Sequence, residues 1–216
     1  MLLTPSPQIE MTVEELAARV GAVPLWRIRS IPSPGTGTEQ DVERVRREES
    51  LLCELIDGVL VEKAVSSKTA ILAIRLSTIL SQFVSSRRLG WVAGPDGFTW
   101  LTKTTLRAPD VSFIARDQLP GNRVPDHGYV DVAPALAAEI FSPGNTQREM
   151  EQKRSDFFAA GTQLFWIVYP DRQEVEVSTG PETHSTVDRN GTLDGGELLP
   201  GFSLKVAELF ADLDLS

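Results

Sequence analysis

The segment PALAAEIF, residues 134 to 141, is apolar on both faces when it is drawn as a β-strand. Its odd and even positions both carry aliphatic or aromatic side chains, and the only charged residue in it is Glu139. LFWIVYP, residues 164 to 170, is a second short run of this kind. Strands that are buried on both sides need cover on both sides. These two runs therefore predict the inner part of a sheet that carries helices on its faces.

The rest of the chain supplies helices and strands that fit such a sheet. A capping box of Thr12 and Glu15 predicts a short helix that ends at Gly21, and Asp57-Gly58 predicts a hairpin turn within residues 51–64. Further expected elements are helical segments at 41–50, 69–84, 147–158 and 206–210, and strands at 91–101, 107–115 and 174–179. We expect an α/β fold, a mixed β-sheet flanked by α-helices.

Length and composition favour one main domain. The chain has 216 residues, 41% hydrophobic and 24% charged, which is enough for one sizeable core and ordinary for a globular protein. We assign residues 1–40 to an N-terminal helix and loop extension and residues 41–216 to the main domain. The net charge of -9 argues against an open basic nucleic-acid-binding surface. Any contact with nucleic acid must be local, metal-assisted or supplied by a partner.

Cysteine usage and the N-terminal sequence bear on the cellular compartment. The single cysteine, Cys53, excludes an internal disulfide framework and a multi-cysteine zinc site, and we interpret it as a buried apolar thiol. MLLTPSPQIE lacks the basic start and apolar stretch of a signal peptide, and no run approaches about 18 apolar residues. We expect a cytoplasmic protein without a membrane partner.

Glu139 needs a partner, because burying a lone carboxylate is costly unless it is protonated, paired or bound to a metal. The following helix offers Lys153. This helix is predicted to begin at a capping box of Thr146 and Glu149. At about 100° per residue, Lys153 projects only roughly 40° from Phe157 on the apolar stripe. The lysine is therefore expected to point towards the sheet.

Two more acids stand in apolar strand segments. Asp110 follows Pro109 and opens the strand VSFIA, and Glu54 lies in the strand before the Asp57-Gly58 turn. Several carboxylates that converge on one point repel one another unless a cation sits among them. Oxygen ligands suit Mg²⁺ or Mn²⁺ better than zinc, and a lysine beside such an ion could orient a water or stabilise a phosphoryl oxygen. The combination suggests metal-dependent phosphodiester hydrolysis.

Each of these residues also has an ordinary structural interpretation. Glu54 could be a surface residue on an edge strand, and Asp110 could cap a turn at a strand entrance. Glu139 and Lys153 could form a buried salt bridge without a metal, or Lys153 could be a solvated helix lysine. The functional interpretation depends on the whole set of residues.

The segments ELIDG, PDVSFI, EIFSPGN followed by EQKRSDFFAAG, and FWIVYP resemble the Uma-two family of the PD-(D/E)XK nuclease superfamily, from about Thr12 to Phe210. The resemblance implies a restriction-endonuclease-like α/β core, with acids from neighbouring strands that hold Mg²⁺. It matches Asp110 to the PD acid, Glu139 to the second acid and Glu54 to the additional acid of ELIDG.

The chain departs from the superfamily pattern at two places. The superfamily has lysine two residues after the second acid, where this chain has Phe141, whereas the Uma-two pattern assigns that role to the following helix, which fits Lys153. Many members also carry a histidine at the start of the long helix after the hairpin, where this chain has Lys68 and Thr69.

We therefore predict a Mg²⁺- or Mn²⁺-dependent endonuclease that hydrolyses DNA, with DNA inferred from the resemblance alone. Asp110 and Glu139 would hold the metal, and Glu54 would contribute to the metal site directly or through water. Lys153 would position the attacking water or stabilise the transition state. A homodimer is a further hypothesis, because double-strand cleavage by one small domain needs two active sites. The alternatives are a non-enzymatic interaction module with the nuclease fold, and a hydrolase of another phosphate ester such as RNA or a nucleotide.

Overall fold

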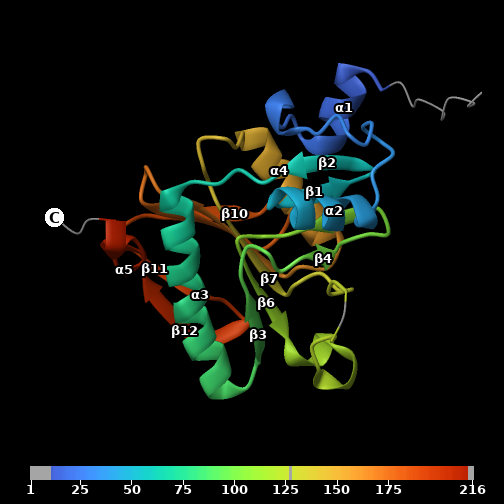
Figure 1. The fold of residues 1–216 in the computed structure, drawn as a ribbon. Helices are drawn as coiled ribbons and strands as arrows, with labels where there is room; N and C mark the ends of the chain where they lie inside the picture. The colour runs from blue at the N-terminus through green and yellow to red at the C-terminus, as the bar shows by residue number, and fades with distance from the viewer. Residues whose placement is uncertain (1–10, 127, 214–216) are drawn as a thin grey trace, which may run out of the picture.

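A computed structural model gives the structure of the chain, and it describes residues 11–126 and 128–213. Residues 1–10 lie outside the described residues. The expectation that the N-terminal sequence is not a signal peptide, and the start of the predicted N-terminal extension, both concern these residues. Figure 1 shows helices packed on both sides of a twisted sheet, with the N-terminal elements gathered at one end. The predicted fold class, a mixed sheet flanked by helices, is confirmed.

The larger sheet has six strands in the order β10-β9-β8-β7-β6-β3. Only β7 and β8 pair in parallel, and the chain between them forms helix α4; the other neighbouring pairs are antiparallel. The strands are β3 (Gly90–Ala93), β6 (Val111–Ala115), β7 (Leu136–Ile140), β8 (Leu164–Tyr169), β9 (Glu174–Ser178) and β10 (His184–Val187). The two runs predicted to be buried on both faces are the central strands β7 and β8, and both are buried throughout.

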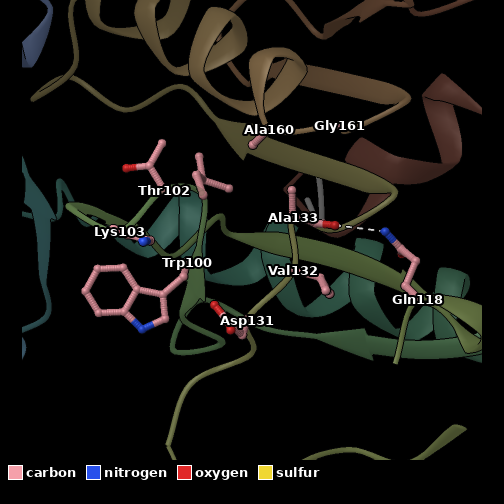
Figure 2. A pocket seen from close by; sticks show the side chains of 10 residues that line it. Trp100, Thr102, Lys103, Gln118, Asp131, Val132, Ala133, Ala160 and Gly161 are labelled. Atoms are coloured by element: carbon pink, nitrogen blue, oxygen red, sulfur yellow. Dashed lines mark hydrogen bonds between the residues drawn. The ribbon is translucent and has the colours of Figure 1, made fainter. Parts of the chain in front are cut away.

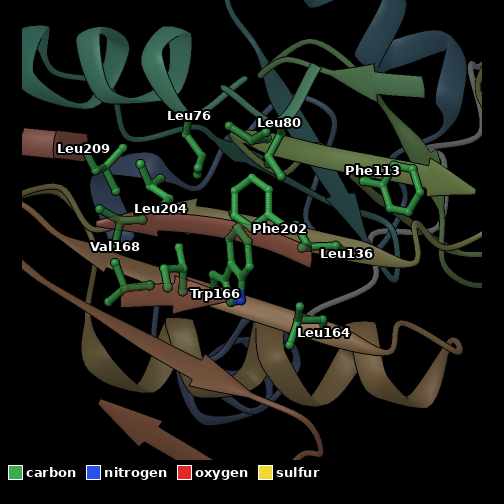
Figure 3. Close-up of a cluster of buried hydrophobic side chains, with 14 of the residues drawn as sticks. Leu76, Leu80, Phe113, Leu136, Leu164, Trp166, Val168, Phe202, Leu204 and Leu209 are labelled. Carbon is green, nitrogen blue, oxygen red and sulfur yellow. The ribbon is translucent and has the colours of Figure 1, made fainter. Parts of the chain in front are cut away.

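One face of this sheet carries the largest apolar cluster (Figure 3). Side chains from α3 (Ser67–Arg87) pack there against alternate residues of β7 and β8 and against Phe202 of β12 (Leu199–Lys205). The strand β11 (Thr192–Gly195), which pairs with β12, and α5 (Val206–Phe210) complete this layer. By length and composition alone α3 could also cross a membrane, but its Leu72, Leu76 and Leu80 are buried in this core.

The other face of the sheet is covered by α4 (Gln147–Ala159), whose Met150 and Phe157 pack on Ala137 and Phe165. The alternation along β7 therefore turns Ala137 and Glu139 towards α4, while Leu136, Ala138 and Ile140 belong to the opposite cluster. This arrangement brings the face of β7 that carries Glu139 against the helix that carries Lys153.

A smaller sheet of four strands has the order β2-β1-β5-β4. Its strands are β1 (Cys53–Ile56), β2 (Val59–Glu62), β4 (Thr99–Trp100) and β5 (Thr105–Arg107). Helix α2 (Glu39–Glu49) packs on it through Val42 and Val45, and the buried thiol of Cys53 lies in the same cluster, as predicted. Helix α1 (Val13–Val20) and the 3₁₀ turn η1 (Leu25–Arg27) lie beside the β1-β2 hairpin. The remaining 3₁₀ turns are η2 (Arg116–Gln118), η3 (Pro120–Asn122) and η4 (Ala211–Leu213).

Two predicted strands are each divided between the two sheets. The strand expected at 91–101 is β3 in the large sheet and β4 in the small one, and the strand expected at 107–115 is β5 in the small sheet and β6 in the large one. Proline cannot donate to a β-ladder, so the pairing of β5 stops before Pro109. The chain crosses between the sheets at Ala108, Pro109 and Asp110, which sets Asp110 at the junction.

The predicted caps and the hairpin turn are confirmed. Thr12 and Glu15 bond each other's backbone at the start of α1, and Gly21 ends the helix with φ +74°. Asp57 and Gly58 both take positive φ, as the tight turn between β1 and β2 requires. The boundary at residue 40 stays a prediction; α1 packs directly on the hairpin through Val20.

Candidate active site

Asp110 directly precedes β6 and lies beside the end of β7 that carries Glu139. Val111 of β6 pairs with Ala138 of β7 in the antiparallel register, so one further step along that register would set Asp110 beside Glu139. Asp110 Oδ2 accepts a hydrogen bond of 2.9 Å from the backbone N–H of Ile140, which fixes its side chain beside the end of β7. The Asp110 side chain is 13% exposed and that of Glu139 only 4%. The two acids thus lie at the same end of the two strands, and Asp110 is the more exposed of them.

Lys153 projects from α4 into this group, as predicted. Its Nζ lies 2.9 Å from Glu139 Oε1 and 3.6 Å from Glu54 Oε2, and the residue is 2% exposed. The helix is set in place by its confirmed cap, in which the Thr146 hydroxyl accepts from the backbone N–H of Glu149. Lys153 therefore joins an acid of the large sheet to an acid of the small one.

Glu54 is held on the small sheet by Arg107. Leu55 pairs with Leu106 in β1 and β5, so Glu54 and Arg107 are the next pair in that register. Arg107 Nη1 lies 2.9 Å from Glu54 Oε2, and the backbone N–H of Ala108 donates to Glu54 Oε1 at 3.1 Å. Arg107 also donates to the Asp156 carboxylate. Both oxygens of Glu54 thus already accept hydrogen bonds within the protein.

Lys63 also belongs to this group, although no local sequence pattern marks it. Its Nζ lies 3.0 Å from Asp110 Oδ1 and 3.3 Å from the carbonyl oxygen of Pro95, and it also donates to the carbonyl oxygen of Ala108. Its side chain is only 4% exposed. The hairpin register could have revealed it, because Glu54 pairs with Val61 and Lys63 shares the face of Val61.

The electrostatic environment separates the two glutamates. Burial raises the pKa of Glu139 to about 7, since the ammonium of Lys153 offsets it only in part and the charge of Asp110 adds to it. Burial acts in the same direction on Glu54, but Lys153 and Arg107 outweigh it and lower the pKa of that carboxyl. Burial alone would lower the pKa of Lys153, but the carboxylates of Glu139 and Glu54 outweigh this effect and raise it. Lys153 therefore stays an ammonium ion.

The residues present suit a hard divalent cation at one position, between Asp110 and Glu139. Burial and the nearby charge of Asp110 raise the pKa of the Glu139 carboxyl, and carboxylate oxygens are the ligands that such an ion prefers. Within residues 11–126 and 128–213, no three His, Cys, Asp or Glu side chains converge as a metal-binding group. The structure therefore does not gather Asp110, Glu139 and Glu54 as three direct ligands; Glu54 reaches the pair through Lys153.

A large surface cavity lies away from these acids. It measures about 700 Å³, and Figure 2 shows Trp100, Thr102 and Asp131 around it. Its lining includes none of Asp110, Glu139, Glu54 and Lys153. A second cavity, of about 480 Å³, includes Phe141, which follows Glu139 by two residues, in its lining. The larger cavity is separate from the candidate centre.

Comparison with known proteins agrees with the resemblance seen in the sequence. Residues 39–207 match the model of the Uma2 family, described as "Putative restriction endonuclease". A crystal structure of a "putative nuclease belonging to DUF820" from Anabaena variabilis ATCC 29413 has the same fold, with a TM-score of 0.65 and 19% sequence identity. The match covers 74% of this chain and 90% of that one. No curated protein matches the chain. Because the family match covers most of its length, the chain belongs to the Uma2 family.

Proposed function

We propose that this protein is a Mg²⁺- or Mn²⁺-dependent endonuclease that hydrolyses phosphodiester bonds in DNA. The observation that carries the proposal is that Asp110, bonded to the backbone N–H of Ile140, lies close enough to Glu139 for its charge to raise the pKa of that carboxyl, with the Lys153 ammonium 2.9 Å from Glu139. The description of the family and that of the structural relative support the nuclease class. DNA as the substrate rests on the family.

Asp110 and Glu139 are the residues that would hold the metal ion. A bound Mg²⁺ would supply positive charge beside a phosphodiester group and lower the pKa of a water molecule. Glu54 would act on the ion only through water, because its own oxygens already accept from Arg107 and Ala108.

Lys153 would contribute a fixed positive charge to the reaction. Its raised pKa keeps it protonated, so it would not act as a general base. An ammonium held in a dry site is well placed to stabilise the negative charge that develops on a phosphoryl oxygen. Glu54 and Arg107 would position Lys153, since Glu54 bonds to Arg107 and lies within 3.6 Å of the ammonium.

The direct test is nicking of supercoiled plasmid DNA in Mg²⁺, Mn²⁺ or EDTA. Wild type should nick with either ion and not in EDTA, whereas Asp110→Asn and Lys153→Met should lose activity by about a hundredfold or more. Asp171→Asn is the matched control, because this carboxylate is exposed and forms its ion pair with the exposed Lys68. Thermal unfolding would establish that each variant is folded. Equal nicking by wild type and all variants would show that Asp110 and Lys153 do not form the catalytic centre.

The competing function is a non-enzymatic interaction module, and one observation favours it. Asp110, Glu139 and Glu54 each already have a cationic partner, in Lys63, Lys153 and Arg107 respectively. The net charge of -9 also suits a partner other than nucleic acid. Calorimetry with Mn²⁺ separates the two functions: a module should show no binding that depends on Asp110.

The substrate and the assembly need their own measurements. Cleavage of duplex DNA, RNA and a nucleotide phosphate ester by the same preparation, compared with Asp110→Asn, would separate the nuclease from a hydrolase of another phosphate ester. We also propose a homodimer, which light scattering would show as twice the mass of the chain. A strictly monomeric protein would rule this out. A cytoplasmic location and the lack of a membrane partner stay predictions.

A further inference from the structure

The ammonium of Lys63 sits among oxygen atoms as a bound cation would. It contacts the carboxylate of Asp110 and the carbonyl oxygens of Pro95 and Ala108. Carboxylate and carbonyl oxygens are also the ligands that hard divalent cations use in proteins. The three oxygens come from the loop after β3 and from the crossing between the two sheets, so they are brought together by the fold and not by local sequence.

Lys63 is held in this position by the hairpin. Its backbone N–H donates to the carbonyl oxygen of Leu52 at 2.9 Å, which extends the β1-β2 pairing by one residue. Its side chain is 4% exposed, and burying an ammonium is costly unless it is paired and hydrogen-bonded. The Asp110 carboxylate supplies the charge and the two carbonyl oxygens supply the remaining hydrogen bonds. The arrangement is therefore a filled cation site and not a surface salt bridge.

We propose that Lys63 is a built-in competitor for the divalent ion, so that a metal binds at Asp110 only when the Lys63 ammonium leaves it. The inference rests on the metal site of the proposed function, but it concerns a residue to which that function assigns no role. If both were bound, the Lys63 ammonium and the divalent ion would share the Asp110 carboxylate. Two cations so close together repel each other, which favours the binding of one at a time. The lysine stem is flexible, and the Asp110 side chain is the more exposed of the two acids.

Calorimetric titration with Mn²⁺ tests the competition without any activity measurement. Lys63→Met removes the charge and keeps the length of the side chain, so this variant should bind Mn²⁺ at least about tenfold more tightly than wild type. Lys68→Met is the matched control: this lysine is 60% exposed and pairs with exposed Asp171. It should bind Mn²⁺ as wild type does. Lys63→Arg, which keeps the charge, should not gain affinity.

The outcomes distinguish failure of the inference from failure of the proposed function. If wild type binds Mn²⁺ and Lys63→Met binds it equally well or more weakly, the competition is refuted while the metal site stands. If neither protein binds Mn²⁺, both ideas fall together. Binding by Lys63→Met alone would support the competition in its strongest form, a site that the lysine closes.

Wild type itself provides a second measurement, in case Lys63→Met does not fold. Acetylation of lysines, followed by mass spectrometry, should modify Lys63 slowly in EDTA and several-fold faster with Mn²⁺, because displacement frees the amine. Lys68 should be modified equally in both conditions. Slow modification of Lys63 that Mn²⁺ leaves unchanged, in protein shown to bind the ion, would overturn the competition.

Discussion

At the scale of single residues, Glu139 shows that the candidate centre is not built for stability. Its carboxyl group is buried beside a second acid, and the one lysine bonded to it is shared with Glu54. The raised pKa means that the folded protein disfavours the ionised form. A carboxyl group whose salt bridge outweighed the cost of its burial would show the opposite shift.

Replacing Glu139 by Gln should therefore stabilise the metal-free protein, and only at higher pH. The folded pKa of about 7 is above the ordinary value of 4.5, so the stability that Glu139 contributes is fully present below the ordinary value and is lost as the pH rises through the folded one. Urea unfolding in EDTA should show little difference between the proteins near pH 4 and a more stable Glu139→Gln protein near about pH 8.

Glu182→Gln is the control for this comparison, because Glu182 is exposed, and it should follow wild type at every pH. A Glu139→Gln protein that is less stable than wild type near about pH 8 would show that the bond to Lys153 outweighs the cost of burial. The carboxylate would then be structural.

The sequence predicted the members of this centre that local patterns reveal. Glu139 is a charge within an apolar strand, Lys153 follows from helical spacing, and Asp110 follows a proline. Lys63 and Arg107 were missed because their contacts cross strands: Arg107 meets Glu54 through the pairing of β5 with β1, residues 53 positions apart. No local pattern specifies that pairing, whereas the hairpin register that places Lys63 was available from the Asp57-Gly58 turn.

At the scale of elements, η1 connects the N-terminal extension to the helix that carries Lys153. Arg27 is 1% exposed and donates to the carbonyl oxygens of Glu62 and Gly144 and to Glu149 Oε2, at 2.7, 3.0 and 2.8 Å. Glu149 belongs to the capping box of α4, so one side chain bonds the end of β2 and the start of α4. The extension is therefore part of the support of the centre.

Arg27→Met should destabilise the fold by about 3 kcal/mol, because it leaves the buried Glu149 carboxylate without its cation. Urea unfolding would measure this loss. Arg47→Met is the control, since this arginine is 72% exposed and its pair with Glu48 should contribute less than about 1 kcal/mol. A loss no greater than that of the control would mean that the extension does not support α4.

Elements whose ends are marked by local chemistry were predictable, and the assignment of strands to sheets was not. The capping boxes at Thr12 and Thr146 and the turn at Asp57 act within four residues, so the sequence specifies them directly. The segments 91–101 and 107–115 each read as one strand, because apolar alternation continues on both sides of their turns. Which sheet each half joins depends on distant partners.

At the scale of the whole molecule, the charge limits how nucleic acid could be bound. A net charge of -9 repels the phosphate backbone, and the lysines of the centre are already bonded to carboxylates. When a protein binds DNA through an open basic surface, divalent ions weaken the binding because they compete for the phosphates. Here a divalent ion between Asp110 and Glu139 would instead supply the missing positive charge.

Binding of DNA should therefore require a divalent ion. Fluorescence anisotropy of a labelled duplex at physiological ionic strength should show no binding in EDTA and clear binding with Ca²⁺, an oxygen-liganded ion, while NaCl of equal ionic strength should not replace it. Asp110→Asn should remove the effect of Ca²⁺, because Asp110 is the more exposed of the two proposed ligands, and Asp171→Asn, which changes an exposed carboxylate paired with Lys68, should keep it. Equal binding in EDTA would instead place the DNA on a basic surface elsewhere on the molecule.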